Sequence, residues 1–313
     1  MKLRLRSLTA TLAVLFSLAS SPMVRAVDLI YATLGDDTIA TFDISSGVGN
    51  TIAATKATLI SSNLSGVRGI ALDLAGNIYA ANNATSSISK YNSSGSYLGN
   101  ITSNVSAPQS LTFDSSGSLY VANINDKRVS KYDSSGAFQS NITTGNQPTG
   151  LAFDNAGTLY VSNFANSTIQ KFDSNGSSSG SISGNLNYPA GLAFDSAGYL
   201  YAANYHYSGN SITKFDSSGS YVSTISGNMV SPFGLAIDSL DNIYVANSGN
   251  GTISKFSPTG TFLTSWSTGS TGPFFLAFKP TPTAVPEPST YALAAIASGV
   301  MAAVARRRKA RLG

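Results

Sequence analysis

The feature that most constrains the fold is a unit of about 41 residues that recurs five times along the chain. In each unit an apolar run ends at an aspartate, and successive aspartates are 41, 40, 41 and 43 residues apart. A tyrosine follows six residues after each aspartate, and an asparagine follows three residues after the tyrosine. These positions are Asp73, Asp114, Asp154, Asp195 and Asp238; Tyr79, Tyr120, Tyr160, Tyr201 and Tyr244; and Asn82, Asn123, Asn163, Asn204 and Asn247. A repeat of this length indicates one supersecondary unit that is stacked several times.

Each unit contains four short β-rich runs, which are separated by clusters of Gly, Asn, Asp and Ser. Runs such as "LAF" and "LYVA" are apolar without alternation, which is typical of strands that are buried on both faces. The first run carries small residues such as Gly150 and Gly191, as expected where inner strands crowd around an axis. Four strands per unit predict a propeller blade. A β-helix is the alternative, although its repeats are shorter and lack four distinct strands.

The two edges of the repeat region determine the number of blades. Residues 29–43 resemble the second and third strands of a unit, and residues 275–278 resemble a first strand without its followers. Joining them gives a sixth blade and closes the ring, which removes the exposed edges of an open sheet. We therefore expect an all-β, six-bladed propeller over residues 27–280, with four-stranded blades and one blade shared by the N- and C-terminal strands.

The blade pattern, "GLAFDSAGYLYAAN" followed by "ITKFDSSG", resembles the NHL repeat over nearly all of residues 29–279. This resemblance implies an NHL-type propeller. In many NHL repeats an aspartate follows the second strand, whereas an asparagine stands at that position in this chain.

Residues 1–26 have the features of a secretory signal peptide. Basic residues precede an apolar stretch from Leu8 to Ala19, and small residues mark a cleavage site after Ala26. The apolar stretch is too short for a permanent membrane span. We expect signal peptidase to remove this segment during export across the inner membrane.

Residues 281–313 combine a linker with a three-part tail. The tail has Pro286, Glu287 and Pro288, then an apolar segment expected to form a transmembrane helix over about 290–305, then a basic end over 306–311. This arrangement resembles the PEP-CTERM sorting signal of exported bacterial proteins. The resemblance implies an exosortase-type processing enzyme as a partner and transient anchoring in the inner membrane. It also implies a destination in the cell envelope or in a secreted, biofilm-associated polysaccharide matrix.

The chain carries a net charge of +4, but the ends supply the excess of positive charge. Of the 19 Lys and Arg residues, four lie in the signal segment and five in the tail. Glu287 is the only acid outside the middle, so residues 27–285 have ten basic and 14 acidic side chains. A net charge near −4 gives no basic surplus for binding nucleic acid. With no cysteine, the exported part has no disulfides.

The repeated aspartates have two alternative interpretations. Asp114-Ser115-Ser116-Gly117, like the later Asp133–Gly136 segment, fits a hairpin turn in which the carboxylate accepts backbone N–H groups. A calcium loop needs several oxygen ligands in one segment and usually a closing Glu. Each of these segments has one carboxylate, so a turn is favoured over a cation site.

Chemistry-bearing residues are scarce. The chain has one histidine, His206, no cysteine, and no glutamate outside the sorting motif. Zinc sites need three or four ligands, and acid–base catalysis needs a positioned histidine or carboxylate. We therefore expect no catalytic residues, no metal and no cofactor. An enzyme resembling the propeller lactonases or lyases is the alternative.

Two sets of loops share one face of such a propeller: those before the first strand and those after the second strand of each unit. Side chains there differ between units, as expected where a repeated framework presents binding residues. The candidate ligand-binding residues are Arg68, Gln109, Lys127, Arg128, Phe164, Tyr205, His206, Tyr207, Phe233 and Phe274. Aromatic, amide and hydroxyl groups together suit a sugar ring or an extended peptide.

We therefore expect a non-catalytic binding or scaffold protein, with an exopolysaccharide or another envelope protein as its partner. Two alternatives stay open: the propeller enzyme named above, and a purely structural matrix component in which Phe233 and Phe274 only pack on the blades.

Overall fold

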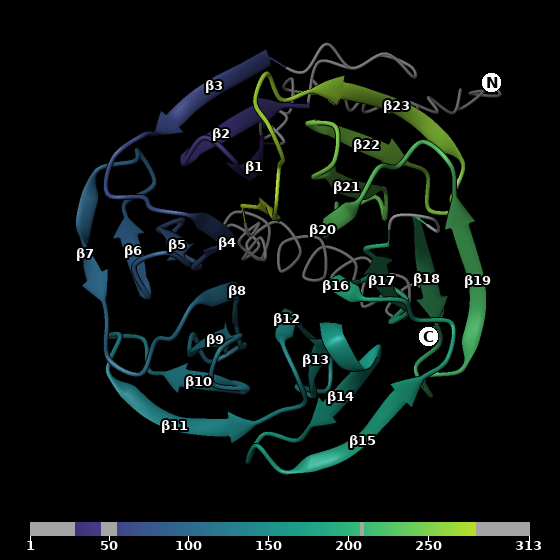
Figure 1. The fold of residues 1–313 in the computed structure, drawn as a ribbon, viewed down its shortest axis with the longest axis horizontal. Coiled ribbons are helices and arrows are strands. Elements are labelled where there is room, and N and C mark those ends of the chain that lie inside the picture. Colours follow the sequence, from purple (N-terminus) through teal and green to yellow (C-terminus); the bar gives the residue numbers. More distant parts are fainter. Residues whose placement is uncertain (1–28, 45–54, 207–209, 280–313) are drawn as a thin grey trace, which may run out of the picture.

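The computed structural model describes residues 29–44, 55–206 and 210–279, and these form a six-bladed β-propeller. Six four-stranded antiparallel sheets surround a central axis, and in five of them the strands run in sequence order from the axis to the rim (Figure 1). One turn of 3-10 helix, η1 (Phe164–Asn166), accompanies the strands in the described part of the chain. The predicted fold class is confirmed.

The strands match the four runs expected for each repeat. The first two complete blades are β4 (Val67–Leu72), β5 (Ile78–Asn82), β6 (Ser87–Tyr91) and β7 (Tyr97–Ile101), then β8 (Pro108–Phe113), β9 (Leu119–Asn123), β10 (Arg128–Tyr132) and β11 (Phe138–Thr143). The next two are β12 (Pro148–Phe153), β13 (Leu159–Asn163), β14 (Thr168–Phe172) and β15 (Ser178–Ser183), then β16 (Pro189–Phe194), β17 (Leu200–Asn204), β18 (Ser211–Phe215) and β19 (Tyr221–Ser226). The fifth is β20 (Pro232–Ile237), β21 (Ile243–Asn247), β22 (Thr252–Phe256) and β23 (Phe262–Ser267).

The closing blade joins segments from the two ends of the repeat region, as the sequence predicted. Its order is β24 (Leu276–Phe278), β1 (Leu29–Leu34), β2 (Thr38–Asp43) and β3 (Thr55–Ile60). Figure 1 shows the yellow inner strand beside the purple strands. The backbone N–H of Thr33 donates to the carbonyl of Phe275 at 3.1 Å, which extends the pairing beyond β24.

Hydrophobic packing joins each blade to the next. The described core divides into six clusters, and each cluster contains residues from two neighbouring blades. The second strand of every complete blade is buried along its whole length, because neighbouring blades cover both faces. The edge of Tyr79, for example, meets the ring of Phe113 in the next blade, with centroids 5.0 Å apart. The ring is therefore held by burial between blades.

Small residues allow the inner strands to approach one another closely near the axis. A Cβ on Gly191 would lie 2.6 Å from the carbonyl oxygen of Phe233 in the next inner strand. A Cβ on Gly69 would lie 2.7 Å from the Cα of Ser110. This confirms the expectation that small residues in the first run permit backbone approach.

The repeated aspartates form the expected hairpin turns. One carboxylate oxygen of Asp114 accepts the backbone N–H groups of Ser116 and Ser118 at 3.0 and 2.9 Å, and Gly117 has a left-handed φ of 82°. The other oxygen faces Lys131, whose Nζ is 3.7 Å away. The carboxylate is thus occupied by its own turn and by the third strand of its blade.

The repeated asparagine is a buried junction inside each blade. Asn123 is fully buried, and its side-chain oxygen accepts the N–H of Ser106 at 2.8 Å, in the loop that enters the blade. Its amide donates to the hydroxyl of Ser130 on the third strand at 2.9 Å, and that hydroxyl donates to the carbonyl of Asn104 in the same entry loop. Asn82, Asn204 and Asn247 make the equivalent bonds. This residue therefore holds the entry loop against strands two and three.

Asn163 is the exception. Its entry loop is one residue shorter, and Gln170 replaces the serine or threonine of the third strand. The amide oxygen of Gln170 accepts the backbone N–H of Gly145 at 2.7 Å and the side-chain amide of Asn163 at 3.0 Å. The side-chain oxygen of Asn163 has no hydrogen-bond partner within the described residues.

Several predicted segments lie outside the described residues. They are the signal peptide over 1–26 with its cleavage site after Ala26, and the tail over 281–313 with its sorting motif and apolar segment. Across residues 29–44, 55–206 and 210–279, no helix is long and apolar enough to cross a membrane.

We predict that Asn123→Ala lowers the free energy of unfolding by about 2–4 kcal/mol, because it leaves the N–H of Ser106 without its acceptor and the buried hydroxyl of Ser130 without its donor. Asn163→Ala removes the same atoms at the same place in the fold but breaks fewer hydrogen bonds, so we expect a loss smaller by at least about 1 kcal/mol. Urea denaturation of the purified protein measures both. Equal losses would contradict the role assigned to the junction.

A second prediction concerns acid. Partial burial raises the pKa of Asp114, but hydrogen bonds from Ser116 and Ser118 outweigh it, and the net pKa lies below 3.8. A pKa that is lower in the folded chain stabilises the fold at pH values above the unfolded pKa of about 3.9, and this contribution is lost as the pH falls further. The stability difference between the wild type and Asp114→Asn should therefore stay constant from pH 7 to about 5 and shrink below about 4. A calcium-dependent rise of the wild-type melting temperature, absent in the variant, would instead reveal a cation site.

Candidate functional site

The buried asparagines hold two loops of each blade together: the loop before the inner strand and the loop after the second strand. Both loops lie on one face of the propeller, called here the upper face. The residue that precedes each inner strand accepts a backbone hydrogen bond from the residue after the buried asparagine. Examples are the N–H of Phe164 to the carbonyl of Gln147 at 3.0 Å, and the N–H of Tyr205 to the carbonyl of Tyr188 at 3.1 Å. Side chains from both loops therefore meet around the upper end of the axis.

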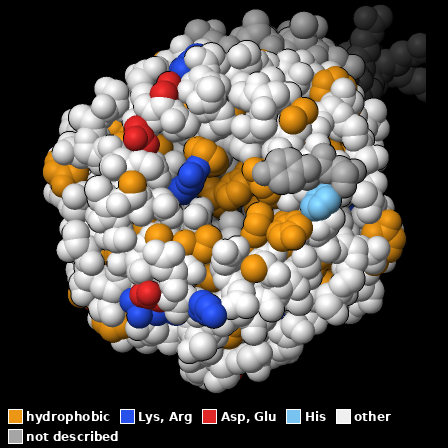
Figure 2. Space-filling model, in the orientation of Figure 1, with side chains coloured by type: hydrophobic (Ala, Val, Ile, Leu, Met, Phe, Trp, Pro, Cys, Tyr) orange, Lys and Arg blue, Asp and Glu red, His pale blue; other side chains and the backbone are white. Residues whose placement is uncertain are grey.

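A shallow cavity of about 230 Å³ lies where these loops converge. Its lining residues are Arg68, Gln109, Ile124, Gln147, Thr149, Phe164, Tyr205, Phe233, Ser248 and Phe274. Six of the ten sequence-predicted residues are thus brought together: Arg68, Gln109, Phe164, Tyr205, Phe233 and Phe274. Figure 2 shows hydrophobic side chains around the central hollow of the molecule.

The aromatic side chains of this face form a continuous line of ring contacts, called here the aromatic arc: Tyr188, Phe164, Tyr205, Phe233 and Phe274. Successive ring centroids are 5.1, 5.8, 5.5 and 5.9 Å apart. Phe233 also meets Phe275 edge-on at 5.4 Å, below the cavity. Tyr188 is 41% exposed, whereas the other four rings are half-buried. The arc therefore runs from the open surface into the mouth of the channel.

Arg68 stands at the inner end of the arc. Its guanidinium carbon lies 3.8 Å from the centroid of the Phe274 ring, in a cation–π contact. Burial lowers the pKa of Arg68, and the charge of Asp37 partly offsets this. The Asp37 carboxylate itself accepts the N–H of Val67 at 2.9 Å.

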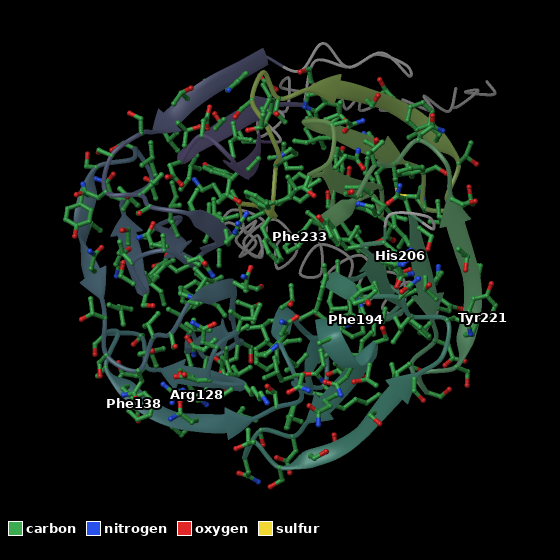
Figure 3. The ribbon with its side chains drawn as sticks, in the orientation of Figure 1. Arg128, Phe138, Phe194, His206, Tyr221 and Phe233 are labelled. Carbon is green, nitrogen blue, oxygen red and sulfur yellow. The ribbon has the colours of Figure 1, made fainter. Side chains whose placement is uncertain are left out.

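Three other predicted residues lie away from the cavity. Arg128 forms an ion pair with Asp126 at 2.8 Å, and the neighbouring Lys127 is exposed. His206 stacks on Tyr188 with centroids 5.7 Å apart, beyond the outer end of the arc. In Figure 3 Phe233 lies near the axis, His206 further out, and Arg128 near the rim. Lys127, Arg128 and His206 lie where the chain passes from the second to the third strand of its blade, which is further from the axis. Tyr207 lies outside the described residues.

Sequence reasoning missed Tyr188, Ile124, Gln147 and Ser248. Each occupies one of two fixed offsets in the repeat: directly before the inner strand, or directly after the buried asparagine. Backbone hydrogen bonds join the residues at these two offsets. The spacing of the repeat could therefore have identified these four residues as part of the upper face. Thr149 lines the cavity, but Ala190, its counterpart in the next blade, is fully buried and does not.

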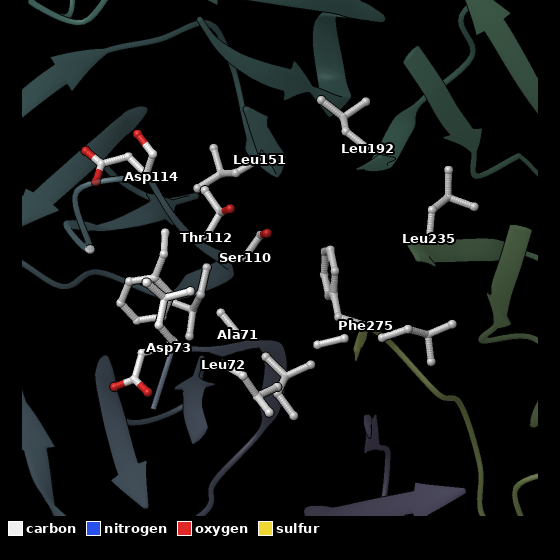
Figure 4. Close-up of a pocket in the computed structure, with 18 residues that line it drawn as sticks. Ala71, Leu72, Asp73, Ser110, Thr112, Asp114, Leu151, Leu192, Leu235 and Phe275 are labelled. Carbon is white, nitrogen blue, oxygen red and sulfur yellow. The ribbon is translucent and has the colours of Figure 1, made fainter. Parts of the chain in front are cut away.

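A larger cavity of about 540 Å³ opens at the other end of the axis. Six equivalent aliphatic residues, one from each inner strand, contribute to it: Ile70, Leu111, Leu151, Leu192, Leu235 and Leu276. Figure 4 shows Leu151, Leu192 and Leu235 around this cavity, with the ring of Phe275 nearer its middle. Phe275 stands where the other inner strands have glycine or serine, and it separates the two cavities. The carboxylates at this end, Asp73 and Asp114, are bound by their own turns.

The upper cavity contains two ionisable side chains, Arg68 and Tyr205. Within the described ranges, no group of three or more histidine, cysteine or acidic residues is arranged to hold a metal ion. The lining therefore offers aromatic faces, amide and hydroxyl groups, and one positive charge.

Two family models match the chain. The NHL repeat model matches residues 146–172, and the PEP-CTERM protein-sorting motif matches residues 284–309. No curated protein matches the chain.

Many solved structures share the fold at low identity. A chain of the nidogen/laminin complex is 16% identical, with a TM-score of 0.68, over 81% of this chain and 98% of that one. A protein of unknown function from Bacteroides caccae is 16% identical, with a TM-score of 0.62, over 81% and 99%. A catalytically inactive virginiamycin B lyase from Staphylococcus aureus, with quinupristin, is 14% identical, with a TM-score of 0.59, over 82% and 94%. Identities this low establish the fold alone.

The internal repeat, the six closed blades and the two matching models agree on one description. The described residues form a six-bladed β-propeller that contains a match to the NHL repeat, and a PEP-CTERM protein-sorting motif follows it in the sequence.

Proposed function

We propose that this protein is an exported, non-catalytic binding module that holds a glycan or a protein partner on the upper face of its propeller. The observation that carries the proposal is the aromatic arc, which leads from exposed Tyr188 into a cavity with amide and hydroxyl groups on its walls. Aromatic faces beside such groups suit ligands that have both apolar and hydroxylated surfaces.

The sorting motif supports the export part of the proposal. PEP-CTERM motifs imply processing by an exosortase, which would release the propeller or anchor it again in the envelope. The predicted cut after Ala26 would be made by signal peptidase. We propose the cell envelope or an extracellular polysaccharide matrix as the destination, with transient anchoring through the apolar segment at about 290–305.

The relation between framework and surface supports binding over a purely structural role. Aspartates, tyrosines and buried asparagines recur with little change from blade to blade, whereas the equivalent cavity positions carry five different residue types in six blades. A repeated scaffold that presents unlike side chains around one depression is typical of a binding surface.

Solved propellers with this fold include lyases, which keeps an enzymatic function as the second candidate. The chemistry of the upper cavity favours binding, because acid–base catalysis needs a group that changes protonation near neutral pH. The residues that line this cavity include no histidine and no carboxylate, the residue types that most often perform this role. Elemental analysis of the purified protein, together with a lyase assay on streptogramin B, tests this point. A stoichiometric divalent metal or measurable turnover would overturn the assignment as non-catalytic.

For the binding site itself, we predict that Tyr205→Ala weakens ligand binding at least about tenfold, because one stacking face of the cavity is lost. Tyr221→Ala is the matched control: Tyr221 is 50% exposed and lies on outer strand β19, at the rim in Figure 3. A glycan array and a pull-down from an envelope extract identify ligands of the wild type. Isothermal titration then compares the two variants.

Phe233→Ala should have an effect similar to that of Tyr205→Ala, provided that its circular dichroism spectrum stays native. The proposed function fails if the wild type binds nothing in either screen. It also fails if both arc variants bind as tightly as Tyr221→Ala.

A further inference from the structure

Arg68 has no carboxylate in ion-pair contact with it among the residues that the structure describes. Across residues 29–44, 55–206 and 210–279, three ion pairs are formed, by Arg128, Lys131 and Lys214. No hydrogen bond from the Arg68 guanidinium to another described residue is present, and its contact is the face of Phe274. A desolvated guanidinium that is held flat on a ring keeps its N–H edge available for another group.

Arg128 provides an internal comparison, because Arg68 and Arg128 are the only arginines between residues 27 and 285. Arg128 starts β10 and is neutralised by Asp126 at 2.8 Å. Arg68 is placed inside the cavity lining; the charge of Asp37 acts on it without an ion pair, and the Asp37 carboxylate accepts the N–H of Val67. The two arginines therefore differ in that Arg128 forms an ion pair within the described residues and Arg68 does not.

A second unsatisfied group lies in the same cavity. The side-chain oxygen of Gln109, at the position of the next blade that corresponds to Arg68, is buried and accepts no hydrogen bond from the described residues. The Gln109 oxygen can accept a hydrogen bond, and the Arg68 guanidinium can donate to an anion. A ligand that carries both a hydroxyl group and a negatively charged acceptor would satisfy both groups.

We propose that the upper cavity selects an acidic glycan, in which the carboxylate of a uronic acid residue binds the edge of Arg68 and a ring hydroxyl donates to Gln109. The ring of the same sugar packs against the arc at Phe233, Phe274 and Tyr205. This inference rests on the proposed binding function of the same face, and it names the class of ligand.

The size and composition of the cavity favour a sugar over a protein segment. About 230 Å³ is below the roughly 300–1,000 Å³ of pockets that enclose drug-sized molecules, and it suits one ring of a longer chain. Apart from Arg68, its polar groups are uncharged amides and hydroxyls: Gln109, Gln147, Thr149, Tyr205 and Ser248. Planar guanidinium groups match carboxylates in a bidentate geometry, which neutral sugars cannot provide.

The test compares carboxylated oligosaccharides with their methyl esters, which keep the sugar backbone and lose the charge. Isothermal titration of the purified protein would use oligogalacturonate, oligomannuronate and hyaluronate oligomers together with each ester. We expect the wild type to bind at least one acid about ten- to a hundredfold more tightly than its ester, the range of a charged hydrogen bond.

Arg68→Gln should bind acid and ester equally. Arg68→Lys keeps the positive charge but loses the paired N–H donors of the guanidinium, so it should retain part of the preference for the acid. Arg128→Gln is the matched control, because it removes the same charge from the same face and should keep the full preference. Native circular dichroism spectra confirm that each variant folds.

Three outcomes would overturn the inference. The first is equal binding of acids and esters by the wild type, which leaves the proposed binding function intact. The second is a preference that survives Arg68→Gln. The third is tighter binding of acidic peptides than of any of these oligosaccharides, which would make a protein the partner. Failure of the wild type to bind any glycan or protein would instead refute the proposed function itself.

Discussion

The rest of the structure depends on the buried asparagine at the end of each second strand. In four of the five complete blades its oxygen accepts an N–H from the entry loop, and its amide donates to a hydroxyl of the third strand. Buried polar groups that are fully satisfied specify one arrangement, because any other arrangement leaves them unpaired. The same bonds place the entry loop beside the residue after the asparagine. The same buried asparagine therefore helps to order the core and to position the loops of the upper face.

Ring closure adds a second constraint, which is specific to the blade made from both termini. Its inner strand β24 has three residues, and Phe275 precedes it where the other inner strands have glycine or serine. Glycine at that position lets the next strand approach, whereas Phe275 turns into the channel and meets Phe233. The departure from the repeat at the closing blade thus divides the axis into two cavities and supports the floor of the upper one.

The candidate site is built from the positions at which the repeats differ. Aromatic side chains come from four different blades, and the framework brings them into one line of contacts. Arg68 enters from a fifth blade and stacks on the last ring of the line. Positions equivalent in sequence carry Arg, Gln, Thr, Ala and Phe, so the surface has no rotational symmetry although the scaffold nearly has it. An asymmetric face of this kind can recognise a single ligand in one orientation.

The sequence by itself determined the repeat, the number of blades, the closing blade, the aspartate turns and the face on which unlike side chains gather. These features follow from local rules, because strand burial and turn chemistry recur at fixed spacing. It also indicated six of the residues that line the upper cavity, since equivalent offsets in a propeller share one face.

Only the tertiary structure decided which of the candidates meet. It separated Lys127, Arg128 and His206 from the cavity, added Tyr188 to the arc, and placed Arg68 on the ring of Phe274 without an ion pair to another described residue. Distance from the axis and contacts between blades are not encoded in spacing along one repeat. They arise when the ring closes and side chains some 200 residues apart in sequence, such as Arg68 and Phe274, come into contact.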